Sequence, residues 1–175
     1  ASLNSSIPFL NIFDGFRTSH ELNEVNIIAD DVIKQMISDK AVARHRQRAL
    51  NPGNPFIHGT AQNPDVYFQG REACNEYHWK VPGIVQETMQ HFEKLTGRTY
   101  KLFEYYGHPE AEKVIIIMGS GAGAVKETVD YLNNIGKKTG YVQVHLYRPF
   151  SVMHFLNELP ETVKKVAVLD RCKDS

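Results

Sequence analysis

The stretch Gly119-Ser120-Gly121-Ala122-Gly123-Ala124 has the residue types and spacing of a phosphate-binding loop. It fits the pattern G-x-G-x-x-A and lies between an apolar run that reads as a strand and an amphipathic stretch that reads as a helix. Glycines permit a tight turn and a close backbone approach, and the free amides of a helix N-terminus favour an anionic phosphate. The spacing therefore predicts a candidate phosphate loop at Gly119, Gly121 and Gly123, of the kind that holds a dinucleotide.

A dinucleotide site makes a second demand, an acidic residue about 20 positions further on, for the ribose hydroxyl. The region from Thr139 to Arg148 contains no Asp or Glu. Arg148 offers a partner for a 2′-phosphate, but Pro149 follows it at once. The alternative is that the small residues simply let the helix pack close to its sheet. Because only half of the fingerprint is present, we favour the packing interpretation.

A second cluster of polar side chains follows the apolar run Ile7–Phe13, which we expect to be a buried strand. The residues from Asp14 to His20 include an acid, a guanidinium, two hydroxyls and an imidazole. Ligands of open α/β sheets bind at such a strand end, and an arginine fork can bond both oxygens of a carboxylate or phosphate. The candidate residues at the edge of a site are Arg17, Thr18, Ser19 and His20. The alternative is a capped helix start with solvated charges.

The charge balance excludes some classes of partner. Twenty basic side chains match twenty acidic ones among 175 residues, so the formal net charge is zero. Such a chain gives no electrostatic case for nucleic acid or an anionic membrane. The basic run Arg44, His45, Arg46 and Arg48 reads as a solvated helix end, where cations suit the helix dipole. No apolar run approaches the ~18 residues of a membrane span.

Cysteine and histidine spacing predicts no metal site. The eight histidines and the cysteines Cys74 and Cys172 show neither a CxxC motif nor a set of ligands at metal spacing. Two distant thiols favour a reducing compartment, the cytoplasm or a reducing organelle of a eukaryote. The sequence starts without Met and stops soon after an apolar run, so we expect a piece of a longer polypeptide.

The order of expected elements indicates the α/β class. The first half carries two expected helices, Asp30–Arg48 and Ile84–Thr96. From Arg98 strands and helices alternate, which predicts a right-handed, mostly parallel sheet. The expected elements of this half are the strands Tyr100–Tyr106, Lys113–Met118, Tyr141–Tyr147 and Lys165–Leu169, and the helices Ala124–Ile135 and Val152–Leu159. Lys113–Met118 and Lys165–Leu169 are continuously apolar after their lysine, so we expect both to be buried.

Several strings together resemble one family, in its order and over nearly the whole chain. They are FDGFRTSHE (Phe13–Glu21), HGTAQNPDVYFQGREA (His58–Ala73), LTGR (Leu95–Arg98), EYYGHPEAEKVIIIMGSG (Glu104–Gly121), ETVDYL (Glu127–Leu132), LYRPFS (Leu146–Ser151) and VAVLDR (Val166–Arg171). These strings are similar to pyruvate:ferredoxin (flavodoxin) oxidoreductase. A likeness of this extent is far more specific than a lone glycine motif.

The resemblance implies a part of a large, multidomain and dimeric enzyme. That family decarboxylates pyruvate oxidatively to acetyl-CoA with thiamine diphosphate, and passes electrons through iron–sulfur clusters to ferredoxin or flavodoxin. Residues 1–97 would be the end of the pyrimidine-side thiamine domain with a connector helix. Residues 98–175 would be most of a transketolase C-terminal-like domain, a three-layer α/β unit with flanking helices, truncated at its C-terminus.

The resemblance also implies that this stretch scaffolds the active site without completing it. The family's cluster-binding cysteines match neither Cys74 nor Cys172, and its substrate-contacting Thr and Arg and cofactor-activating Glu precede these residues. We therefore expect no catalytic residue here, and no cofactor bound by this stretch alone. Two alternatives stay open: a non-catalytic module of the same ancestry, such as the one in a fungal sulfite reductase flavoprotein, or an NADP-binding module using Gly119–Gly123 and Arg148.

Overall fold

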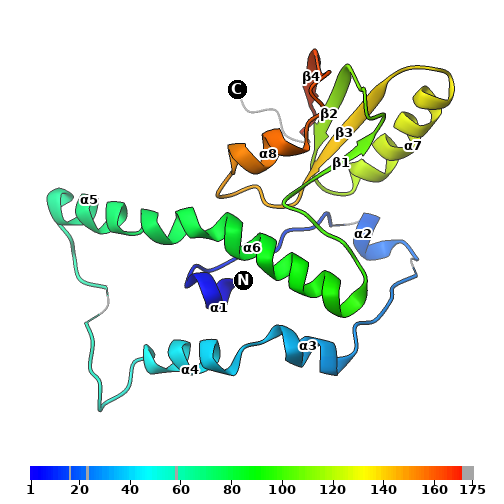
Figure 1. The fold of residues 1–175 in the computed structure, drawn as a ribbon. Helices are drawn as coiled ribbons and strands as arrows, with labels where there is room; N and C mark the ends of the chain where they lie inside the picture. The colour runs from blue at the N-terminus through cyan, green and yellow to red at the C-terminus, as the bar shows by residue number, and fades with distance from the viewer. Residues whose placement is uncertain (16, 23, 58, 171–175) are drawn as a thin grey trace. The chain divides into compact units, whose positions relative to one another are not determined.

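The computed structural model describes residues 1–15, 17–22, 24–57 and 59–170 (Figure 1). The chain divides into two compact units. The first contains residues 1–10 and 26–99, and the second contains residues 11–25 and the chain from Tyr100 onward. A short segment from the first half of the sequence therefore belongs to the unit formed by the second half.

The described part of the first unit is helical. Its helices are α1 (Ser2–Ser5), α3 (Asp30–Met36), α4 (Asp39–Gln47), α5 (Pro64–Ala73) and α6 (Asn75–Thr96). The helix predicted over Asp30–Arg48 is divided into α3 and α4, because Ile37 and Ser38 are extended. The Ser38 hydroxyl accepts a hydrogen bond from the Ala41 amide at 3.3 Å, and so acts as the N-cap of α4.

Helix α6 is longer than the sequence predicts, since it begins at Asn75 and not at Ile84. Pro82 lies inside it, although a proline removes one backbone hydrogen bond from a helix. The neighbouring Val81 is fully buried and Val85 is nearly so, and this packing offsets the lost bond. The helix ends at Gly97, whose φ of 72° lies in the left-handed region that suits glycine.

The prediction of a buried strand over Ile7–Phe13 is wrong. These residues form no strand, and the side chains of Leu10 and Ile12 are 90% and 85% exposed. An apolar run becomes a strand only where a neighbouring strand pairs with it. Among the described residues of the chain, none provides that partner.

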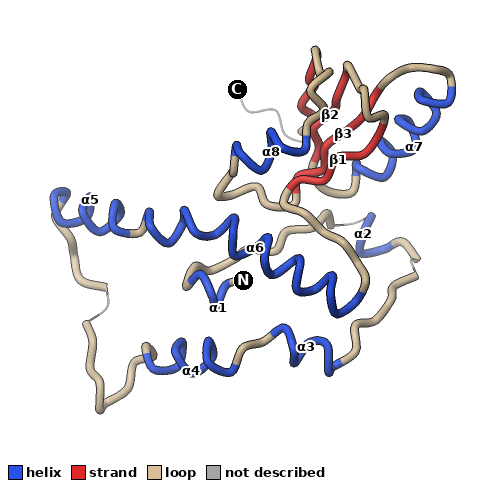
Figure 2. Tube along the Cα trace, in the orientation of Figure 1, coloured by secondary structure: helices blue, strands red, loops and turns tan. Residues whose placement is uncertain are grey.

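The second unit contains a four-stranded sheet, drawn in red in Figure 2. Its strands β1 (Phe103–Gly107), β2 (Lys113–Ile117), β3 (Thr139–Val144) and β4 (Lys165–Val168) lie in the order β1-β3-β2-β4. Strand β1 is antiparallel to β3, while β3, β2 and β4 are parallel. The unit also contains α2 (Arg17–His20), α7 (Gly121–Asn134) and α8 (Val152–Glu158). The predicted α/β class and mostly parallel sheet are confirmed.

Each face of this sheet carries one helix, and Figure 1 shows α7 and α8 on opposite sides. On the α7 face, Ile117 and Tyr141 form a buried cluster with Ala122 and Val129 of the helix. On the other face, the buried ring of Phe103 lies 5.5 Å from the ring of Phe155 in α8. The unit thus has three layers, a sheet with one helix on each face.

Strand β4 was predicted to be buried, and this prediction is wrong. All four of its residues are exposed, with Val166 at 49% and Val168 at 71%. A continuous apolar run does not tell a central strand from an outer one. Strand β2 lies between β3 and β4 and buries Val114, whereas β4 pairs only with β2 in the described chain.

Two glycines permit a close contact between β1 and β3. Gly107 and Gly140 are register partners, and the φ of Gly107 is 137°. A β-carbon added at Gly140 would overlap the ring and hydroxyl of Tyr105. That hydroxyl donates a hydrogen bond to the His108 carbonyl at 2.5 Å, and burial raises the pKa of Tyr105. The ring therefore fills the space that a side chain at position 140 would need.

Gly140→Ala is expected to destabilise the second unit by about 1–3 kcal/mol, because Tyr105 has to leave its position over β3. Native-state hydrogen exchange of the β3 amides measures this loss. Gly123→Ala is the matched control: its β-carbon in the first turn of α7 meets nothing within 4 Å, so we expect no loss of stability and a gain of at most about 1 kcal/mol. Unchanged β3 exchange in Gly140→Ala would contradict the packing role assigned to this glycine.

Candidate functional site

The glycine loop follows the central strand β2 and leads into α7. From β2 the chain crosses by α7 to β3 on one side, and it later returns by α8 to place β4 on the other side of β2. Such a reversal of direction is a topological switch point, where open α/β sheets bind ligands outside the carboxyl ends of their strands. The loop therefore lies at the edge of the sheet where a ligand site is expected.

The Asp14 carboxylate occupies this loop. Its Oδ2 accepts a hydrogen bond from the Ser120 amide at 2.6 Å, across 106 positions of the sequence. Helix α7 has no acidic residue in its first turn, and the Ser120 side chain makes no capping bond. The first amides of a helix lack partners within the helix, and negative charge near them is stabilising. Asp14, which is far from α7 in the sequence, thus supplies the negative charge that the start of α7 lacks.

The three glycines of the loop meet different surroundings. Gly119 has a φ of 74°, and a β-carbon there would lie 2.8 Å from Asp14 Oδ2. A β-carbon at Gly121 would lie 3.0 Å from Ile117 Cδ1, so this glycine lets α7 approach the sheet. A β-carbon at Gly123 would meet nothing within 4 Å. The surroundings of Gly121 support the packing interpretation of the motif.

Loop amides beyond Ser120 also have partners. The Ala122 amide donates to the Gly119 carbonyl at 3.2 Å, and the Gly123 amide donates to the Ser120 carbonyl at 3.3 Å. A phosphate at this loop would therefore compete with a carboxylate at one amide and with turn hydrogen bonds at two others. Phosphate binding by the loop stays a prediction.

The other candidate residues, Arg17, Thr18, Ser19 and His20, form the short helix α2, and the side chain of Arg17 lies outside the described part of the chain. This helix belongs to the same unit as the glycine loop, and it starts three positions after Asp14. The Ser19 hydroxyl and His20 Nδ1 lie 2.9 Å apart, within hydrogen-bond distance. The structure thus places Asp14, three positions before α2, against the glycine loop, which lies about a hundred residues away in the sequence.

Arg148, the candidate partner of a 2′-phosphate, lies beside an aromatic ring. Its guanidinium carbon is 5.3 Å from the centre of the Tyr147 ring, a cation–π distance. The side chain is exposed. The NADP-binding alternative requires Arg148 and the glycine loop to act together, and the contact of Arg148 with Tyr147 gives it no support.

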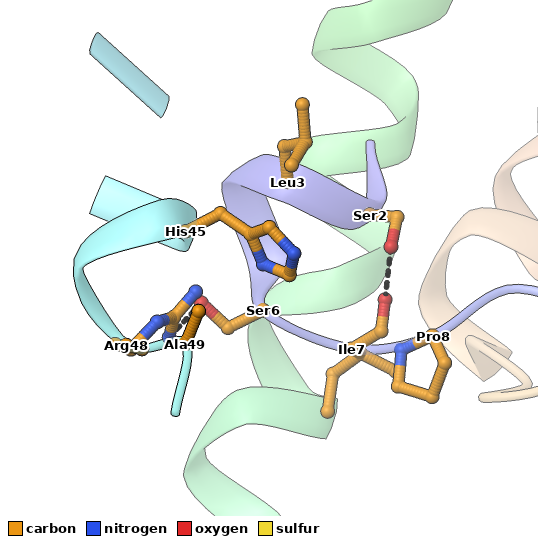
Figure 3. A pocket seen from close by; sticks show the side chains of 8 residues that line it. All are labelled: Ser2, Leu3, Ser6, Ile7, Pro8, His45, Arg48 and Ala49. Carbon is orange, nitrogen blue, oxygen red and sulfur yellow. Dashed lines mark hydrogen bonds between the residues drawn. The ribbon is translucent and has the colours of Figure 1, made fainter. Parts of the chain in front are cut away.

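The basic run at the end of α4 borders a separate hollow in the first unit. The hollow has a volume of about 360 Å³, and Figure 3 shows the residues that line it: Ser2, Leu3, Ser6, Ile7, Pro8, His45, Arg48 and Ala49. Arg48 donates to the Ser6 hydroxyl and Arg44 to the Leu3 carbonyl, both at 3.0 Å. These two arginines fasten α4 to the start of the chain, so they are not simply a solvated helix end.

The strands β2, β3 and β4 are linked at their starts by ion pairs. Lys138 lies 2.5 Å from Glu110 and Lys164 lies 2.8 Å from Glu112, and each hydrogen bond lowers the pKa of its carboxyl. These charges are exposed to solvent, where ion pairs stabilise little. They lie at the amino edge of the sheet, opposite to the glycine loop, and are not part of the candidate site.

The described residues form neither a cluster of metal ligands nor a membrane-spanning helix. No three His, Cys, Asp or Glu side chains in the described ranges lie close enough to hold a metal ion. None of the helices in that part of the chain is long and apolar enough to cross a membrane. The Cys74 thiol donates to the Gly70 carbonyl at 3.2 Å, and Cys172 lies outside the described residues.

Comparison with known proteins adds the family. Residues 1–90 match the family model of the pyruvate flavodoxin/ferredoxin oxidoreductase thiamine diphosphate-binding domain, more than half of the chain. The chain belongs to this family. Residues 111–174 match the model of pyruvate:ferredoxin oxidoreductase core domain II. The resemblance deduced from the sequence strings is thereby confirmed.

Individual relatives of this oxidoreductase family are similar over the whole chain. A pyruvate-flavodoxin oxidoreductase of Rhodospirillum rubrum is 56% identical over 100% of this chain and 15% of its own length. A pyruvate:ferredoxin oxidoreductase of Moorella thermoacetica is 50% identical over 99% of the chain and 15% of its own. A mitochondrial pyruvate dehydrogenase [NADP(+)] of Euglena gracilis is 49% identical over 99% and 10%. The chain thus spans about one seventh of the length of the first two relatives.

One solved structure shares part of the chain at lower similarity. It is a 2-oxoglutarate:ferredoxin oxidoreductase from Magnetococcus marinus with 2-oxoglutarate, coenzyme A and succinyl-CoA bound. It aligns over 63% of this chain and 17% of its own, with 21% identity and a TM-score of 0.37. At that score the alignment carries no argument about the site.

Sequence reasoning missed the contact of Asp14 with the glycine loop. Asp14 is visible in the sequence as an acid after an apolar run, but nothing local connects it with Ser120, 106 positions away. The available signal was indirect: α7 starts without an acidic residue in its first turn. A helix start that lacks its acid suggests looking for one elsewhere in the chain.

Titration with NADPH is expected to show no binding that depends on the glycine loop, because the Ser120 amide already bonds Asp14. Isothermal titration calorimetry of the protein and of Gly121→Val checks this. We expect the two titrations to coincide. Tight binding of NADPH that Gly121→Val abolishes would contradict the expectation and restore the dinucleotide interpretation.

Proposed function

We propose that this chain is part of an enzyme that oxidatively decarboxylates pyruvate to acetyl-CoA and passes the electrons to ferredoxin or flavodoxin. The observation that carries the proposal is the match of successive parts of one chain to the thiamine diphosphate-binding model and the core domain II model. Sequence identity of 50–56% to pyruvate oxidoreductases supports pyruvate as the substrate.

Within that enzyme, the chain scaffolds the active site and does not complete it. Thiamine diphosphate, when bound, supplies the electron sink for decarboxylation. The described residues offer no set of thiols for an iron–sulfur cluster. The described cysteine, Cys74, donates a hydrogen bond to the Gly70 carbonyl of α5. The clusters therefore require cysteines from outside the described residues.

The domain assignment follows from the same proposal. Residues 1–97 form the end of the pyrimidine-side thiamine domain with its connector helix, and residues 98–175 form most of a transketolase C-terminal-like domain. The two compact units support this division, since they change over between Thr99 and Tyr100. The segment 11–25 is the exception, because it groups with the second unit.

We assign Arg17, Thr18, Ser19 and His20 to the edge of the active site. Their support is that α2 belongs to the same unit as the switch-point loop, where a ligand site is expected. An arginine fork with neighbouring hydroxyls is suited to an anionic group, such as the pyruvate carboxylate or a phosphate of coenzyme A. The remaining domains of the enzyme, a second subunit, and ferredoxin or flavodoxin are its partners in a reducing compartment.

The full-length protein is expected to reduce ferredoxin or flavodoxin only when pyruvate, coenzyme A and thiamine diphosphate are all present. The reduction of each carrier is followed by its change in absorbance under anaerobic conditions. Omission of one component at a time provides the controls. A purified full-length protein that holds thiamine diphosphate and its clusters but does not oxidise pyruvate would contradict the proposal.

Arg17→Ala is expected to raise the KM for pyruvate or coenzyme A by roughly 10–100-fold, since a hydrogen bond to a charged group is worth about 1.5–3 kcal/mol. Steady-state kinetics with each substrate varied in turn shows which of them is affected. Arg46→Ala is the matched control, because Arg46 is an exposed arginine of α4 in the other unit. Equal kinetics for both variants would remove Arg17 from the site.

A further inference from the structure

We propose that Asp14 is a positioning residue that anchors the segment 11–25 to the glycine loop and thereby holds α2 at the carboxyl edge of the sheet. The loop that resembles a phosphate site binds a carboxylate of its own chain. The anchor itself stands on the contact with Ser120, and its consequence for catalysis rests on the proposed function.

The segment has little else of a regular kind to fasten it. Apart from the four-residue helix α2, its described residues form neither helix nor strand. Its four described apolar side chains are exposed: 85% for Ile12, 70% for Phe13, 103% for Leu22 and 76% for Val25. Burial of these four side chains therefore does not hold the segment in place. The bond from Ser120 to Asp14 is short and involves a charged acceptor, so it can fasten the segment to the loop.

The loop is shaped for an anion at this position. The left-handed φ of Gly119 turns the backbone, so that the Ser120 amide points toward the carboxylate at the amino end of α7. A side chain at position 119 would occupy the space of Asp14 Oδ2, 2.8 Å from its β-carbon. Two features therefore require glycine at position 119: the backbone conformation and the carboxylate beside it.

The anchor acts on α2 through a short piece of chain. Arg17 follows Asp14 by three positions, and three residues span at most about 11 Å. With the Asp14 side chain held on Ser120, the first residue of α2 is confined to the neighbourhood of the switch point. Release of Asp14 would leave α2 attached to the sheet only by its remaining contacts.

Hydrogen exchange of the full-length protein, measured by mass spectrometry, tests the anchor. In Asp14→Ala we expect exchange at the Ser120 amide and at residues 17–22 to become at least tenfold faster, because the charged acceptor is lost. Sodium acetate should reverse part of this increase, compared with sodium chloride at equal ionic strength, since its carboxylate can bond the vacated amide. Because acetate also stabilises folded proteins in general more than chloride does, the recovery has to be confined to Ser120 and residues 17–22 and absent from the β3 amides.

Two further variants complete the test. Glu24→Ala removes the same charge from an exposed position of the same segment, so its exchange should stay unchanged. Asp14→Asn keeps the shape and one acceptor oxygen without the charge, and we expect an intermediate increase. Asp14→Asn also keeps the test usable if Asp14→Ala does not fold. Unchanged exchange at Ser120 in both Asp14 variants would overturn the anchor.

A rise at Ser120 without a rise at residues 17–22 would overturn the positioning of α2. Kinetics gives the catalytic consequence: Asp14→Ala should raise the KM for pyruvate or coenzyme A more than it lowers kcat, and acetate should partly restore it. Absence of pyruvate oxidation in the unsubstituted protein would refute the proposed function but leave the exchange results intact. The two failures are therefore distinguishable.

Discussion

The amino end of α7 sets a condition that the second unit has to satisfy, because the first amides of a helix find no partners within it. The crossover from β2 brings this end to the carboxyl edge of the sheet, at the point where the direction of the strands' connections reverses. The loop before it carries no acid of its own. The requirement for negative charge is met by Asp14, and with that contact a segment from the first half of the sequence becomes part of the unit.

The same condition explains why the glycine motif was ambiguous. A loop that turns sharply, exposes amides and precedes a helix suits a phosphate and a carboxylate equally well. Gly119 and Gly121 have separate local reasons to be glycine, one beside Asp14 and the other beside Ile117. Neither reason depends on a dinucleotide: Gly119 makes room for a carboxylate of the same chain, and Gly121 lets the helix pack against the sheet.

The sequence predicted the second unit well and the first unit poorly, for a physical reason. Helix and strand periods from Tyr100 onward give the right elements because successive strands there pair within the same stretch. Ile7–Phe13 has an equally apolar pattern, but its residues find no strand partner among those described. The predicted burial of β4 is wrong for a similar reason: the neighbours of a strand, and not its apolar pattern, decide whether it is central. The candidate site at Arg17–His20 was recognisable locally, whereas its link to Ser120 depends on the tertiary fold.

Because residues 11–25 belong to the second unit, a single cut cannot divide the protein into its two units. The chain passes from one unit to the other three times, near positions 10, 25 and 99. A single cut after residue 97 would follow the boundary suggested by the sequence, yet it would leave Asp14 on the wrong piece. The severed C-terminal piece would then keep its sheet and lose the capping acid of α7. In this protein the second compact unit is not one continuous stretch of the sequence.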